Sequence, residues 1–82
     1  MTSVGDIISV VASFGPRMGI RPVRFRWRGR LIEVGEITYA WKTREGREEL
    51  HHFSVSSESS LYELSFNTTS LVWRIEGVDD PV

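Results

Sequence analysis

The sequence of 82 residues contains no cysteine. This absence excludes disulfide bridges and thiolate metal sites, and it favours a reducing compartment. No stretch approaches the run of about 18 apolar residues that a transmembrane helix needs. No basic segment followed by a long apolar run opens the chain either. We therefore expect a cytoplasmic protein that does not enter a membrane.

Lysine is almost absent, because nine of the ten basic residues are arginine. The net charge is −1, but residues 17–30 carry six arginines and no acidic residue. Residues 31–82 hold four basic and ten acidic residues, a balance of −6. The planar guanidinium group suits paired contacts with carboxylates and phosphates. The charge pattern therefore predicts a cationic surface on an otherwise acidic protein.

Residues 22–28 alternate between apolar residues and arginine without interruption. A period of two is typical of a β-strand whose two faces differ. The pattern predicts that Val23, Phe25 and Trp27 share a buried face and that three arginines share the other. Those three are Arg24, Arg26 and Arg28.

The dipeptide Arg28-Gly29 is typical of a two-residue hairpin turn, in which glycine supplies a positive φ. A turn at this position sets Phe25 opposite Ile32 and Arg24 opposite Glu33. Apolar residues then face apolar ones and a cation faces an anion, which supports this register independently.

The third predicted strand, residues 30–43, changes phase near its middle. Its inward positions are even-numbered up to Val34 and odd-numbered from Ile37 through Tyr39 to Trp41. A β-bulge at Gly35-Glu36 explains the change, because a bulge bends a strand and increases its twist. A strand bent in this way can serve both halves of a small barrel.

Residues 1–82 are therefore predicted to form a single all-β domain, a six-stranded antiparallel meander that is strongly bent or partly closed into a small barrel. The first strand is apolar on both faces, so we expect it to be central, covered or part of a subunit contact. The predicted strands are residues 6–14, 20–28, 30–43, 48–56, 60–66 and 71–76.

No residue pattern predicts catalysis, a cofactor or a metal ion, so we do not expect an enzyme. His51 and His52 are adjacent in a predicted strand and should point to opposite faces. The sequence contains no third histidine and no cysteine that could complete a metal site. The serines fit no nucleophile motif, and Glu33 and Glu36 are expected to pair with arginines.

The cationic face is the one feature that predicts a partner, either an acidic protein surface or a nucleic-acid backbone, although a plain solvated face also fits the pattern. Association through the apolar first strand, giving a homodimer or an assembly subunit, is the alternative. The candidate partner-binding residues are Arg17, Arg21, Arg24, Arg26, Arg28, Arg30 and Lys42.

Three segments together resemble a small bacterial all-β family of unknown function. They are the hairpin of residues 21–30 with Glu33-Val34 and Trp41 after it, the Tyr62-Glu63-Leu64 strand and the final Trp73-Arg74-Ile75 strand. Some members of that family are associated with DNA-damage-tolerance polymerases of the Y-family type. The resemblance implies a compact β domain whose aromatic residues form the core, and an accessory role in DNA repair. It supplies no catalytic or binding residues.

Overall fold

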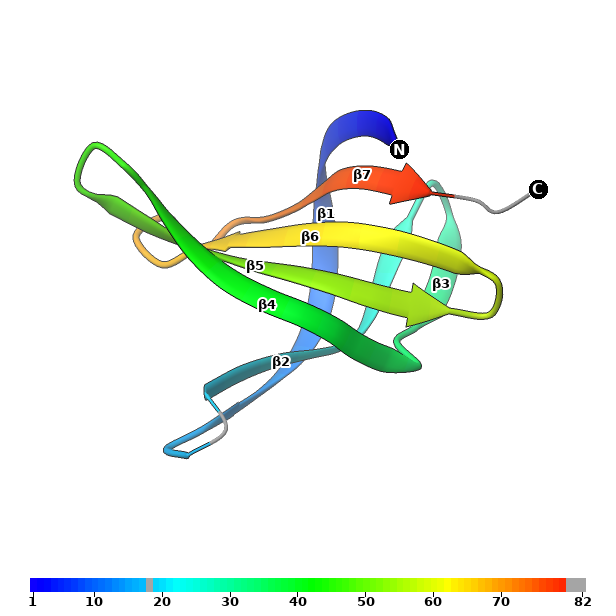
Figure 1. Ribbon diagram of the computed structural model, residues 1–82, viewed down its shortest axis with the longest axis horizontal. Coiled ribbons are helices and arrows are strands. Elements are labelled where there is room, and N and C mark those ends of the chain that lie inside the picture. Colours follow the sequence, from blue (N-terminus) through cyan, green and yellow to red (C-terminus); the bar gives the residue numbers. More distant parts are fainter. Residues whose placement is uncertain (18, 80–82) are drawn as a thin grey trace.

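Seven β-strands make up most of the computed structural model, which describes residues 1–17 and 19–79 (Figure 1). The strands are β1 (Thr2–Gly15), β2 (Gly19–Trp27), β3 (Arg30–Glu33), β4 (Glu36–Glu45), β5 (Glu48–Ser57), β6 (Ser60–Asn67) and β7 (Trp73–Asp79). The predicted all-β class is confirmed, but the number of strands is seven where the sequence pattern predicted six.

All seven strands belong to one antiparallel sheet with the order β3-β2-β1-β7-β6-β5-β4. The first and last strands pair with each other, so β1 lies inside the sheet between β2 and β7. The sheet bends strongly but does not close, since β3 and β4 are its two free edges (Figure 1). The predicted bend and the interior position of the first strand are therefore confirmed. The predicted single meander is wrong, because β1 pairs with β7 and the consecutive strands β3 and β4 do not pair.

The extra strand arises because the predicted third strand divides at residues 34–35. The Val34 amide donates a hydrogen bond to the Val23 carbonyl on the β2 side at 3.0 Å. The next amide, that of Gly35, donates to the Ser56 carbonyl on β5 at 2.7 Å. A Cβ atom on Gly35 would lie only 3.2 Å from that carbonyl oxygen, so this crossing point favours glycine. One continuous segment thus supplies both edges of the sheet.

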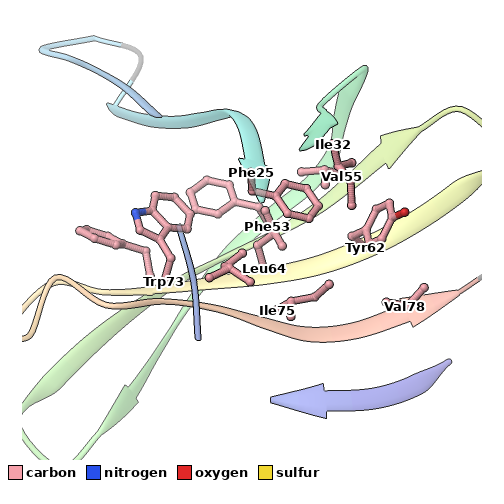
Figure 2. Close-up of a cluster of buried hydrophobic side chains, with 11 residues drawn as sticks. Phe25, Ile32, Phe53, Val55, Tyr62, Leu64, Trp73, Ile75 and Val78 are labelled. Carbon is pink, nitrogen blue, oxygen red and sulfur yellow. The ribbon is translucent and has the colours of Figure 1, made fainter. Parts of the chain in front are cut away.

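The core lies on the inner face of the bent sheet, where β2 and β3 lean over β5, β6 and β7 (Figure 2). Phe25 is buried and meets Tyr62 edge-to-face, with 5.3 Å between ring centroids. Trp73 stacks on Phe53 at 5.7 Å. The predicted core positions of Phe25, Tyr62 and Trp73 are confirmed, whereas Trp27 is half-buried and packs against the margin of the core.

Two bulges overturn parts of the predicted alternation. In β2 the register moves between Arg24, opposite Val11, and Pro22, opposite Ala12. Val23 is the extra residue and is exposed, so the prediction that it is buried with Phe25 is wrong. A bulge leaves one residue without an opposite partner and shifts the phase beyond it.

The second bulge lies in β4, where Ile37 is opposite Val55 but Tyr39 is opposite Ser54. Tyr39 therefore points away from the core and is 66% exposed, and Trp41, opposite His52, lies on the same face. The predicted inward positions of both residues are wrong. The last predicted strand began at Leu71, but β7 begins at Trp73, and Leu71 lies before it with φ 60° and is exposed.

Candidate interaction surface

The β2–β3 hairpin is the element that presents most of the predicted site. Its register places Phe25 opposite Ile32 and Arg24 opposite Glu33, as predicted from the sequence. Arg28 and Gly29 form the turn, and both have positive φ, 51° and 75°. Positive φ at both central residues matches the right-handed twist of the flanking strands. Arg28 is therefore a turn residue, and the prediction that it lies in one row with Arg24 and Arg26 is wrong.

The end of this hairpin is fixed to β1 through Asp6. The Trp27 indole Nε1 donates a hydrogen bond to the Asp6 carboxylate at 3.0 Å. The Arg28 guanidinium lies 4.5 Å from the centre of the Trp27 ring, and its Nε lies 3.8 Å from the same carboxylate. Trp27 also meets Tyr62 edge-to-face at 6.3 Å. These contacts hold the turn in one position relative to the rest of the sheet.

The outer face of β1, β2 and β3 carries a mixed apolar and cationic surface, which we call the outer patch. Cross-strand pairing sets Val11 beside Arg24 and sets Arg26 between Ser9 and Leu31. Val11 and Leu31 are 49% and 53% exposed, and these side chains surround a shallow hollow of about 260 Å³. Ile7, two residues before Ser9 on β1, is also exposed. The outer patch comprises Ile7, Ser9, Val11, Arg24, Arg26 and Leu31.

The two arginines of the outer patch carry unneutralised charge. Among the described residues, no carboxylate oxygen lies within 4.0 Å of the guanidinium nitrogens of Arg24 or Arg26. Glu33 is opposite Arg24 in the register, yet the two side chains form no ion pair. Without an internal counter-charge, both groups can pair with an external anion.

The other predicted site residues lie elsewhere. Arg17 is exposed in the β1–β2 turn, and Arg21 lies opposite Ser13 beyond the β2 bulge. Arg30 is opposite Trp27 and therefore shares the inner face with it. Lys42 belongs to β4, at the opposite edge of the sheet from β3. Of the predicted set, only Arg24 and Arg26 line the hollow of the outer patch.

The adjacent histidines do occupy different environments, as the strand geometry predicted. His51 Nε2 lies 3.4 Å from a carboxylate oxygen of Glu49. His52 stacks on Trp41 with 5.1 Å between ring centroids, and its Nε2 lies 2.6 Å from the Thr43 hydroxyl. No group of three or more potential ligands for a metal ion occurs in the part of the chain that the structure describes.

Sequence reasoning missed a groove along the free edge of β3. All four β3 residues line it, together with Trp27 and Tyr62 from the inner face and Glu58 from the β5–β6 turn, and its volume is about 370 Å³. The alternation of residues 22–28 identified the hairpin, but it gave no signal that residues 30–33 would form an edge strand separated from residues 36–45.

No family model, curated protein or solved structure matches this chain. Within residues 1–17 and 19–79, no helix has the length and apolar character needed to cross a bilayer. The functional argument therefore depends on the geometry of the surface itself.

Proposed function

We propose that this protein is a non-catalytic interaction module that binds an acidic, partly apolar protein surface through the outer patch. The observation that carries the proposal is the placement of Arg24 and Arg26, which lack an internal counter-charge, beside the exposed Val11 and Leu31. Arginine is enriched in the centres of protein interfaces, where aliphatic and guanidinium groups are buried together.

A nucleic-acid backbone is the less favoured partner for this patch. Binding of single strands combines cations with exposed aromatic rings on which bases stack. The two rings on β2 belong to Phe25, which is buried, and Trp27, which is engaged by Asp6 and Arg28. Exposed aliphatic groups between the arginines gain nothing from contact with phosphates.

Self-association through the first strand is less favoured for a different reason. Ile7 and Val11 do expose apolar surface on the outer face of β1. A two-fold interface brings the same surface of both copies together, so it must be self-complementary. Centred on the outer patch, it would also bring Arg24 and Arg26 of the two copies together, and like charges in contact oppose association.

The pathway in which the module acts is proposed only from the resemblance of its hairpin and two of its strands to the small bacterial all-β family. That resemblance supports an accessory role in DNA repair, with a protein of DNA-damage tolerance as the partner.

The test compares two double variants with the same change in net charge. Arg24→Glu with Arg26→Glu alters the outer patch, and Arg44→Glu with Arg47→Glu alters the β4–β5 hairpin. In affinity capture from the native host, one protein should be retained by the wild type and the control variant and lost by the patch variant. Retention by all three would contradict the proposal.

The wild type and the two double variants also test the two less favoured partners, a nucleic acid and a second copy of this chain. Binding to labelled single- and double-stranded DNA, measured by fluorescence anisotropy at low and moderate salt, should be absent. Binding that falls steeply with salt and disappears in the patch variant would instead indicate phosphate contacts. Light scattering that shows a dimer in the wild type and a monomer in the patch variant would support self-association.

A further inference from the structure

We infer that the groove along the free edge of β3 is a binding site for an extended peptide that pairs with β3. From its N-terminus, this peptide carries a basic residue, an apolar residue, any residue and an acidic residue. This site differs from the outer patch, with which it shares Leu31. Arg30 and Ile32 of the groove point to the inner face, whereas Arg24 and Arg26 point to the outer face.

The edge of β3 is open along its whole length. β3 is the terminal strand of the sheet, and no other described strand pairs with the side of it that faces away from β2. Neither a bulge nor a proline interrupts Arg30–Glu33. The strand has only 4 residues and a charged residue at each end, features that oppose pairing with strands that do not match those charges. Extended peptides bind such edges by adding a strand, with main-chain hydrogen bonds giving affinity and side-chain pockets giving specificity.

The hydrogen-bonding groups that face the groove can be assigned from the register. The Val34 amide donates to the Val23 carbonyl, so amides at every second residue before it, at Ile32 and Arg30, also point toward β2. The backbone groups of Leu31 and Glu33 therefore point toward the free edge. A peptide that runs antiparallel to β3 would exchange hydrogen bonds with these two residues.

Apolar and aromatic side chains form the floor of the groove at its centre, and polar side chains line the rest of it. Ile32, Tyr62 and Val78 are buried and line this part of the groove (Figure 2). The half-buried Trp27 lines it as well. Successive residues of a strand alternate between faces. The peptide residue opposite Ile32 therefore faces this apolar floor and should itself be apolar.

The two ends of the groove carry opposite charge. Arg30 lies at one end, and among the described residues no carboxylate oxygen approaches its guanidinium within 4.0 Å. Glu33 lies at the other end. Two residues later, the Gly35 amide donates to the Ser56 carbonyl, which places this end next to the turn that carries Glu58. An antiparallel peptide begins at the Glu33 end, so its basic residue precedes the apolar one and its acidic residue lies opposite Arg30.

A second copy of this chain does not satisfy the site. In a two-fold antiparallel pair, directly opposite residues lie on the same face of the sheet. Arg30 and Glu33 lie on opposite faces, so Arg30 of one copy cannot be opposite Glu33 of the other. A symmetric pair would instead set Arg30 against Ile32 or Leu31 against Glu33. The occupant is therefore a segment of a different protein.

The test begins with selection from a displayed library of short random peptides against the folded, full-length protein. We expect enrichment of the order basic, apolar, any, acidic. The double variant Arg30→Glu with Glu33→Lys should select the reverse charge order, because it exchanges the two ends of the groove. Arg24→Glu with Arg26→Glu should leave the selected order unchanged, so failure of the outer patch and failure of this groove are distinguishable.

Synthetic copies of the selected peptide then test the pairing on the wild-type protein, which avoids any variant that fails to fold. N-methylation of the residue opposite Leu31 removes a donor to β3 and should weaken binding about tenfold or more. N-methylation of the residue opposite Ile32, whose amide points away from β3, should change affinity about twofold at most. Equal effects of the two methyl groups, or no enriched peptide order, would overturn the proposal.

Discussion

The indole N–H of Trp27 donates to the carboxylate of Asp6 at 3.0 Å, across 21 residues of sequence. This contact joins the start of β1 to the end of β2, and the guanidinium of Arg28 covers the same ring. The arginine-rich hairpin is thus fixed at its tip as well as along its strands, which keeps the outer patch and the β3 groove in a constant relative orientation.

The hydrogen bond between Trp27 and Asp6 should make a small, measurable contribution to stability. Trp27→Phe removes the donor and keeps an aromatic ring, and Asp6→Ala removes the acceptor. Each should lower the free energy of unfolding by about 1 kcal/mol, the usual net value of one hydrogen bond. Urea denaturation of both single variants and the double variant measures the coupling. Fully additive effects would show that the contact contributes nothing.

The positive φ of Gly29 should make the hairpin turn sensitive to any side chain. Gly29 has φ 75°, and a Cβ atom there would meet no heavy atom within 4 Å. Gly29→Ala should therefore destabilise the protein by about 1 kcal/mol through backbone strain alone. Gly15 is a matched control, because its Cβ would also be free of contacts and its φ is not positive. Gly15→Ala should be neutral or slightly stabilising, and an equal loss at both sites would contradict the argument.

Much of the fold could be predicted from alternation and turn residues alone. The register of β2 with β3 followed from Arg28-Gly29 and from the match of Phe25 with Ile32. The errors at Val23 and Tyr39 share one cause, since each lies where a bulge shifts the phase of its strand. The change of phase near Gly35 was visible, but the pairing of its two sides with different strands depends on long-range contacts.

The candidate site was only partly predictable for a related reason. The alternation of residues 22–28 correctly placed Arg24 and Arg26 on one face, and the cross-strand pairing then set Val11 and Leu31 beside them. The β3 groove depends on where the sheet fails to close, which is a property of the whole topology. The alternation of residue types predicts which side chains share a face of a strand. It does not predict whether another strand pairs with each edge of that strand.

The stacked pair of Trp41 and His52 should stabilise the β4 edge. The two rings are nearly parallel, 8° apart, with 5.1 Å between centroids. A double-mutant cycle with Trp41→Ala and His52→Ala should give a coupling of about 1 kcal/mol. Tyr39, which lies on the same face with its ring 5.3 Å from Trp41, is far more exposed. Tyr39→Thr should therefore cost less than Trp41→Ala, and the reverse order in denaturation midpoints would contradict this assignment.

Phe25 and Arg26 are neighbours on β2 that should respond to truncation in opposite ways. Phe25 is 1% exposed and contacts the ring of Tyr62, so Phe25→Ala should cost about 3–5 kcal/mol, a large part of the stability of a domain of this size. Arg26 is exposed and has no ion pair within the described chain, so Arg26→Ala should change stability by about 0.5 kcal/mol or less. Chemical denaturation measures both. A large loss of stability in Arg26→Ala would mean that the outer patch is maintained for folding, and the reason to assign it to a partner would disappear.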